Sequence, residues 1–313
     1  MIWLLTTLQQ WILFSATMLL TGCVAWRTLI APAASATAED CASVFAAGDS
    51  LTVRWARISS WALMAAWLMR MSLQIIAFRD PFVPLGDDIS LLLFQTAWGT
   101  TWMIQGVVVI GIAGVLRWGV PRESGDGLSR PMKITPVIST LPVLVLSLIL
   151  TLSMSGHAMG AGSWRWAAVM ADAIHTLSAG VWIGSLVVIL GVSREGLNGS
   201  ARATSAFLAQ IQIFSPIALV SGGAVVSMGI ALSWTHLTMI SDLWTTRYGL
   251  ILSAKVIFVI LILGLGFLNW RTGTSGSGPK AVMRTIRQRG SWEVSLAAGV
   301  ILLTAILVHS TKP

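Results

Sequence analysis

Residues 250–268 read LILSAKVIFVILILGLGFL, an apolar run in which Lys255 is the single charged residue. A helix needs about 20 such residues to cross the hydrocarbon core of a bilayer. Runs of this kind predict eight spans, at residues 9–30, 55–78, 96–117, 134–153, 166–192, 213–234, 247–269 and 292–310. Backbone polar groups in lipid must be paired within each segment, which favours helices. The sequence therefore predicts an all-α fold, a polytopic transmembrane helical bundle of about eight spans.

The composition agrees with a chain surrounded by lipid. Of the 313 residues, 55% are hydrophobic and 10% are charged, and the mean hydropathy is +0.81. Soluble domains carry roughly 25% charged residues, because water must solvate their surface. The net charge of +8 could suggest nucleic acid, but the basic residues lie in short loops between apolar runs. That distribution is typical of membrane topology, and we expect no nucleic-acid binding.

The basic residues also predict the orientation of the chain. Fourteen Lys and Arg residues fall in the first, third, fifth and seventh loops, against four in the even loops and the tail. The positive-inside rule then places the odd loops in the cytoplasm and both termini outside. Residues 20–23 (LTGC) and 34–36 (ASA) resemble cleavage sites of a leader peptide, but the first 26 residues contain neither Lys nor Arg. We therefore expect residues 9–30 to be a true span.

All four histidines fall in the outer half of this predicted topology. Methionines stand near two of them, at residues 154 and 159 around His157 and at residue 239 after His236. Imidazole and thioether groups are ligands that suit copper. Surface histidines are common, however, and methionine is also an ordinary apolar residue. The placement favours a metal site on the outer side without deciding it.

Three charged residues lie inside predicted spans. A charge near the bilayer centre is costly, so it usually faces the bundle interior with a partner. Asp172, Lys255 and Arg70 each lie about eight residues inside the outer end of their span, at a common depth of about 12 Å. Asp172 can therefore neutralise Lys255 or Arg70, and His175 lies one turn deeper on the same helical face. This cluster predicts either a buried ion pair that fixes packing or a polar cavity open to the outside.

Several segments together resemble one family of bacterial inner-membrane proteins. Residues 172–184 (DAIHTLSAGVWIG) resemble the histidine-bearing helix of the copper resistance protein D family, and residues 155–158 (SGHA) resemble its outer loop. Further similar segments are residues 246–249 (TRYG) with Lys255, residues 269–271 (NWR), residues 292–293 (WE) and residues 307–311 (LVHST). The resemblance covers about residues 150–313. We therefore predict an N-terminal four-span half, residues 1–150, and a C-terminal four-span half, residues 151–313.

The resemblance implies copper handling at the periplasmic face of the inner membrane, alongside a periplasmic copper-binding protein. Combined with the residues, it predicts an outward-opening copper site, with the oxidation state left open between Cu(I) and Cu(II). Its expected ligands are His157 and His175, assisted by Met154 or Met159 and by Asp172, with His236 and His309 as additional candidates. We expect no enzyme, because no catalytic constellation is seen, and no nucleotide-binding motif indicates an ATP-driven pump.

Two other functions stay open at this point. A b-type cytochrome would hold haem between paired histidines at matching depth on facing helices. Only His175 is clearly within a span, which weakens that reading. The other alternative is a membrane assembly or interaction protein whose buried charges are purely architectural.

Overall fold

A computed structural model describes residues 2–38, 41–119, 138–156, 162–195, 201–234, 237, 239–273 and 278–310, and these residues contain helices and no strand. The main helices are α1 (Ile2–Ala25), α2 (Ala31–Thr37), α3 (Ala42–Phe78), α4 (Leu85–Phe94), α5 (Ala97–Trp118), α6 (Leu141–Met154), α7 (Arg165–Ala179), α8 (Ser185–Glu195), α9 (Ala201–Trp234), α10 (Asp242–Thr245), α11 (Arg247–Gly273) and α12 (Pro279–Leu307). Two π-helical turns connect helices into longer rods, η1 (Trp26–Ile30) between α1 and α2 and η6 (Gly180–Gly184) between α7 and α8. The short 3-10 turns η3 (Ile138–Thr140) and η5 (Gly162–Trp164) precede α6 and α7.

The predicted fold class is confirmed. In the described part of the chain, seven helical stretches are long and apolar enough to cross a membrane, and each coincides with a predicted span. The eighth prediction, residues 134–153, corresponds to η3 and α6, and α6 is a shorter apolar helix of 14 residues. The start of that predicted span lies outside the described residues. The chain is a multi-pass helical membrane protein.

Several helices extend beyond the spans that hydropathy predicts. Helices α3, α9 and α12 begin at residues 42, 201 and 279, whereas the apolar runs begin at 55, 213 and 292. Hydropathy detects the part of a helix that contacts lipid, but helical hydrogen bonding continues into the polar residues beyond it. Basic residues expected in loops, such as Arg54 and Arg289, therefore lie on helices. The expected loop at residues 79–95 likewise contains the short helix α4.

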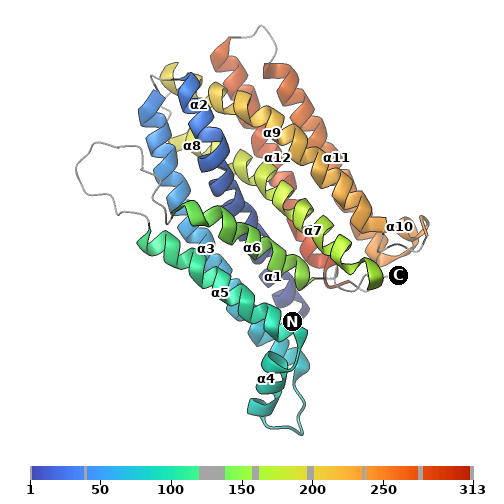
Figure 1. Ribbon diagram of the computed structural model, residues 1–313. Coiled ribbons are helices and arrows are strands. Elements are labelled where there is room, and N and C mark those ends of the chain that lie inside the picture. Colours follow the sequence, from blue (N-terminus) through green and yellow to red (C-terminus); the bar gives the residue numbers. More distant parts are fainter. Residues whose placement is uncertain are drawn as a thin grey trace.

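Both termini lie at the same end of the bundle, together with α4 and α10 (Figure 1). This arrangement is the one expected if the chain crosses the membrane an even number of times. The end of α2, the start of α3, the end of α11 and the start of α12 lie at the opposite end (Figure 1). We call the end with the termini the terminal end.

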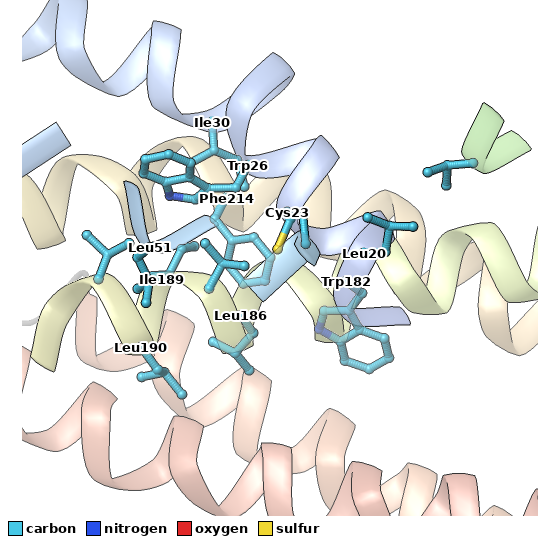
Figure 2. Close-up of a cluster of buried hydrophobic side chains, with 14 of the residues drawn as sticks. Leu20, Cys23, Trp26, Ile30, Leu51, Trp182, Leu186, Ile189, Leu190 and Phe214 are labelled. Carbon is cyan, nitrogen blue, oxygen red and sulfur yellow. The ribbon is translucent and has the colours of Figure 1, made fainter. Parts of the chain in front are cut away.

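Helix α1 lies at the centre of the bundle. It packs against α3, α6, α8 and α12, which belong to both predicted halves of the chain. Its side chains Leu20 and Cys23, together with Trp26 at the start of η1, meet α8 and α9 residues such as Ile189 and Phe214 in one apolar cluster (Figure 2). Burial of these side chains against each other excludes lipid from the middle of the bundle. The division into halves at residue 150 stays a prediction.

Glycines allow α1 and η6 to touch along their backbones. A Cβ atom added to Gly22 would lie within clashing distance of the Gly184 backbone, and one added to Gly184 would meet the Met18 carbonyl. Gly180 in turn packs against the Thr21 side chain, 2.7 Å from where its own Cβ would lie. Small residues permit this close approach between membrane helices. Gly180 and Gly184 therefore act as packing residues between α1 and η6.

Candidate functional site

A cavity of about 510 Å³ occupies the terminal half of the bundle. Its walls come from α1, α3, α6, α7, α9, α11 and α12, that is, from helices far apart in the sequence. Five of the side chains singled out by the sequence line it: Arg70, Asp172, His175, Lys255 and His309. Ala179 and Trp182, which continue the helical face of Asp172 and His175, also line this cavity. A cavity that these charged side chains line is therefore present within a mostly apolar wall, which includes Trp182, labelled in Figure 2.

His175 is held in one orientation by the neighbouring helix. Its Nδ1 atom lies 2.9 Å from the carbonyl oxygen of Val225 on α9. A carbonyl oxygen only accepts, so Nδ1 carries the proton that is donated, and in the neutral ring the Nε2 lone pair remains available. Gly229, one turn further along α9, leaves room for the ring, because an added Cβ there would lie 3.3 Å from His175 Cε1. A metal-ligating histidine has this arrangement, with one nitrogen anchored and the other free to coordinate.

Asp172 and Lys255 form the electrostatic centre of the cavity. The two side chains are half-buried on α7 and α11, and their charges interact directly. Lys255 also interacts electrostatically with His175. Charges in a region of low dielectric interact strongly, so each charge depends on the other for stabilisation. A cation that enters the cavity meets a carboxylate already engaged by an ammonium group.

Arg70 has its own set of partners at the terminal end. Its guanidinium donates to Oε1 of Gln105 at 3.4 Å and to Oγ of Ser155 at 3.1 Å. It also lies over the ring of Trp98, with 5.8 Å between the guanidinium carbon and the ring centroid. These contacts place Arg70 between α3, α5 and the end of α6. Sequence reasoning found the residue but not these partners.

A second cavity, of about 630 Å³, adjoins the first between α9 and α11. Its lining is mostly apolar and includes Trp234, Met239 and Leu263. His175 and Lys255 line both cavities, so they form part of the boundary between them. No pattern in the sequence predicts this second cavity.

The segment at residues 246–249 shapes the start of α11. The hydroxyl of Thr246 accepts a hydrogen bond from the backbone N–H of Gly249 at 3.0 Å, which caps the helix. Gly249 is required because a Cβ there would collide with the carbonyl of Asp242 on α10. Tyr248 is buried and lines the first cavity. Tyr248 therefore belongs to the site, although sequence reasoning assigned it no role beyond the family resemblance.

The predicted ligands are only partly brought together in the described residues. Met154 packs against Ala168 and Val169 of α7, and His309 is exposed at the end of α12. His157, Met159 and His236 lie outside the described residues, although Gly156, which directly precedes His157, lines the cavity. Within the described part of the chain, no three residues among His, Cys, Asp and Glu group closely enough to hold a metal ion. The ligand set stays a prediction.

The fold and the site together define a class, that of polytopic helical membrane proteins with a cavity at one end that charged side chains line. Residues 208–307 match the family profile described as Copper resistance protein D. This part of the chain is therefore similar to the copper resistance protein D family, in agreement with the resemblance seen in the sequence. The matched segment spans most of α9, all of α10 and α11, and α12. It thus contains Lys255, Tyr248 and Gly229, three residues that line the first cavity.

Two curated relatives extend the similarity towards the N-terminus. Copper resistance protein D of Pseudomonas syringae pv. tomato is 25% identical over 221 residues, which cover 70% of this chain and 67% of that protein. Copper transport protein CutJ of Bacillus subtilis (strain 168) is 24% identical over 221 residues, covering 70% of this chain but 37% of CutJ. The chain thus spans little more than a third of CutJ. No solved structure matches this chain.

Proposed function

We propose that this protein binds copper in the cavity at the terminal end of the bundle and takes up or transfers the ion from the periplasmic face of the bacterial inner membrane. The observation that carries the proposal is the orientation of His175. Its Nδ1–H is anchored on the Val225 carbonyl, and the residue lines the cavity with Nε2 available for a metal. The names of the family and of its relatives supply the metal. Copper is the cargo of this site.

The groups around His175 suit a site that binds a cation and releases it again. Asp172 offers carboxylate oxygens, and Lys255 compensates that charge when the cavity holds no cation. A bound copper ion would compete with the Lys255 ammonium for the Asp172 carboxylate. Net positive charge from Lys255 and Arg70 opposes tight retention, so we expect exchange rather than permanent storage. Imidazole with thioether ligands favours Cu(I), whereas imidazole with carboxylate also accepts Cu(II).

We assign the terminal end to the periplasm on the distribution of basic residues. Most of the Lys and Arg residues fall in or beside the odd connections of the predicted topology, which is typical of the cytoplasmic side. The start of α3 and the start of α12, which carry several of them, lie at the end opposite to the termini. Both termini, the segment that precedes His157 and the exposed His309 would then face the periplasm. That placement gives a periplasmic copper-binding protein direct access to the cavity. Such a protein is the partner we propose, acting as donor or acceptor of the ion.

Copper binding to the purified protein tests this function, and Gly229 provides a sharp variant. Gly229→Ala should weaken copper binding about tenfold, the scale of losses seen when a group that orients a metal ligand is disturbed. The added methyl group would press on the His175 ring, whereas at Gly223, on the same helix, an added Cβ meets nothing within 4 Å. Gly223→Ala should therefore bind copper like the parent. The measurement is metal analysis after equilibrium dialysis of each purified protein.

Three results would contradict the proposal. A parent protein that retains no copper at micromolar free concentrations would reject the function itself. A visible haem spectrum in the purified protein would support the b-type cytochrome reading instead, in which His175 ligates iron. Equal binding by Gly229→Ala and the parent would remove His175 from the site.

A further inference from the structure

A carboxyl group is buried inside the bundle, away from the residues discussed above. Glu293 lies on α12 within a candidate membrane span and is only 3% exposed. The side-chain amide of Asn269 on α11 donates from Nδ2 to Glu293 Oε1. Gly266, one turn before Asn269, brings α11 close, since its Cβ position lies 4.0 Å from Glu293 Oε2. An acidic side chain within a span is expected to have a function.

The hydrogen bonds of this pair indicate the protonation state of the acid. Among the described residues, Asn269 Oδ1 is a buried oxygen for which no donor is found. An ionised carboxylate offers only acceptors, so it can satisfy the amide N–H but not the amide oxygen. A protonated carboxyl has both a carbonyl oxygen and an O–H, which complement the N–H and the oxygen of an amide. A proton on Glu293 therefore supplies the donor that Asn269 Oδ1 needs.

The charged groups nearby are engaged elsewhere. The Arg289 guanidinium, one turn from Glu293, donates to the Leu268 carbonyl and to the Thr272 hydroxyl. Arg194 on α8 donates to Ser291. Two further basic residues belong to α11: Lys255, which lines the first cavity, and Arg271, in the last turn of the helix. Helix α1, which also packs against α12, carries no charged residue, and on α9 the charged residue is Arg202 in its first turn. An ionised carboxyl without a cation in such surroundings is neutralised by protonation instead.

The position of Glu293 relates it to the first cavity. Ile262 of α11 and Ala297 of α12 are lining residues towards the inner end of that cavity. Gly266 and Glu293 lie one helical turn further in on the same two helices, four residues from Ile262 and Ala297 respectively. Glu293 thus stands just beyond the residues that close the cavity between α11 and α12. In the described part of these two helices, it is the first acidic group that a cation moving inward would meet.

We propose that Glu293 and Asn269 form an intramembrane proton-binding site at the inner end of the cavity. The ligand is a proton, held on the Glu293 carboxyl and donated to the amide oxygen of Asn269. Glu293→Gln preserves the size of the side chain and can pair with Asn269 as one amide with another. That variant should therefore fold while lacking the proton site.

Infrared spectroscopy of the purified, metal-free protein in lipid nanodiscs tests this site directly. The parent should show a protonated-carboxyl C=O band at neutral pH that disappears at alkaline pH, and Glu293→Gln should lack it. Asp49 serves as an internal control, because it is paired with Arg27 at 2.9 Å and should be ionised. Asp49→Asn should leave the band unchanged. If the parent and Glu293→Gln show the same spectrum across this pH range, the proposal is wrong.

Chemical modification provides a second measurement on the same samples. Dicyclohexylcarbodiimide reacts with protonated carboxyl groups in apolar surroundings, and mass spectrometry locates the adduct. Glu293 should be modified at least about tenfold more than Asp49, the ratio that one unit of difference in proton affinity produces. Modification of Asp49 in preference to Glu293, together with no acid band, would overturn the proposal. Because both measurements omit metal, a protein that shows the proton site but binds no copper would reject only the copper function.

Discussion

Replacing His157 and His175 together by alanine should reduce copper binding by more than about 100-fold, beyond the loss produced by disturbing a supporting group alone. His175→Ala should have the larger single effect, because His175 is anchored on Val225 and lines the cavity beside Asp172. His157 follows Gly156 at the cavity wall, so His157→Ala should weaken binding less. Copper retained after dialysis and copper-dependent growth are the two readouts. Each variant is first checked for normal insertion in the membrane.

A double variant that binds copper and supports growth like the parent would place the site elsewhere. The second cavity would then be the first region to consider, since Met239 lines it and Lys255 borders it. Normal binding by His157→Ala combined with loss in His175→Ala would confine the site to the described residues. That result would keep the cavity as the binding site and remove the loop from it.

Asp172 and Lys255 should stabilise the protein as a pair. Asp172→Asn leaves an ammonium without its carboxylate, and Lys255→Met leaves a carboxylate without its ammonium. Breaking a fully buried pair costs roughly 3–5 kcal/mol; both side chains here are half-buried and line a cavity, so we expect about 1–3 kcal/mol for each single variant. The double variant Asp172→Asn/Lys255→Met should recover much of that loss. Thermal or denaturant unfolding in detergent measures the loss of stability in the two single variants and in the double variant.

The same set of single and double variants, with Arg70→Met in place of Lys255→Met, distinguishes the two partners that the sequence left open for Asp172. Arg70 donates to Gln105 and Ser155, so the effects of Arg70→Met and Asp172→Asn should add. Additive effects for Asp172 and Lys255, with coupling between Asp172 and Arg70 instead, would reject our assignment of the ion pair. Copper binding should fall in Asp172→Asn even where the fold is maintained, because a carboxylate ligand is lost.

The sequence predicts the spans well because lipid exposure demands apolar side chains along a helix. It also predicts that Asp172, His175 and Lys255 lie close together, as a packing ion pair or around a cavity, and all three line the first cavity. This success has a simple geometric cause, since a constant rise per residue converts position in a span into depth. Charges at equal depth on different helices must face inward, and a bundle brings them together.

The remaining features depend on how the helices pack sideways, which hydropathy does not record. The His175 hydrogen bond to Val225 joins residues 50 positions apart and depends on the register between α7 and α9. The contact of Arg70 with Ser155 joins residues 85 positions apart. Glu293 and Asn269 appeared in the sequence only as parts of a family resemblance, and their pairing depends on the approach of α11 and α12. Helix α4 was not predicted because it lies outside the spans in a segment interrupted by prolines.

Side-specific loading of copper in sealed membrane vesicles tests the central claim most directly. Right-side-out vesicles that contain the parent protein should bind added copper rapidly, whereas inverted vesicles should bind it only after the membrane is made permeable. Vesicles with the His157→Ala/His175→Ala variant should bind no more copper than vesicles without the protein in either orientation. Rapid loading of intact inverted vesicles, or equal loading by the parent and the double variant, would contradict a copper site that opens to the periplasm.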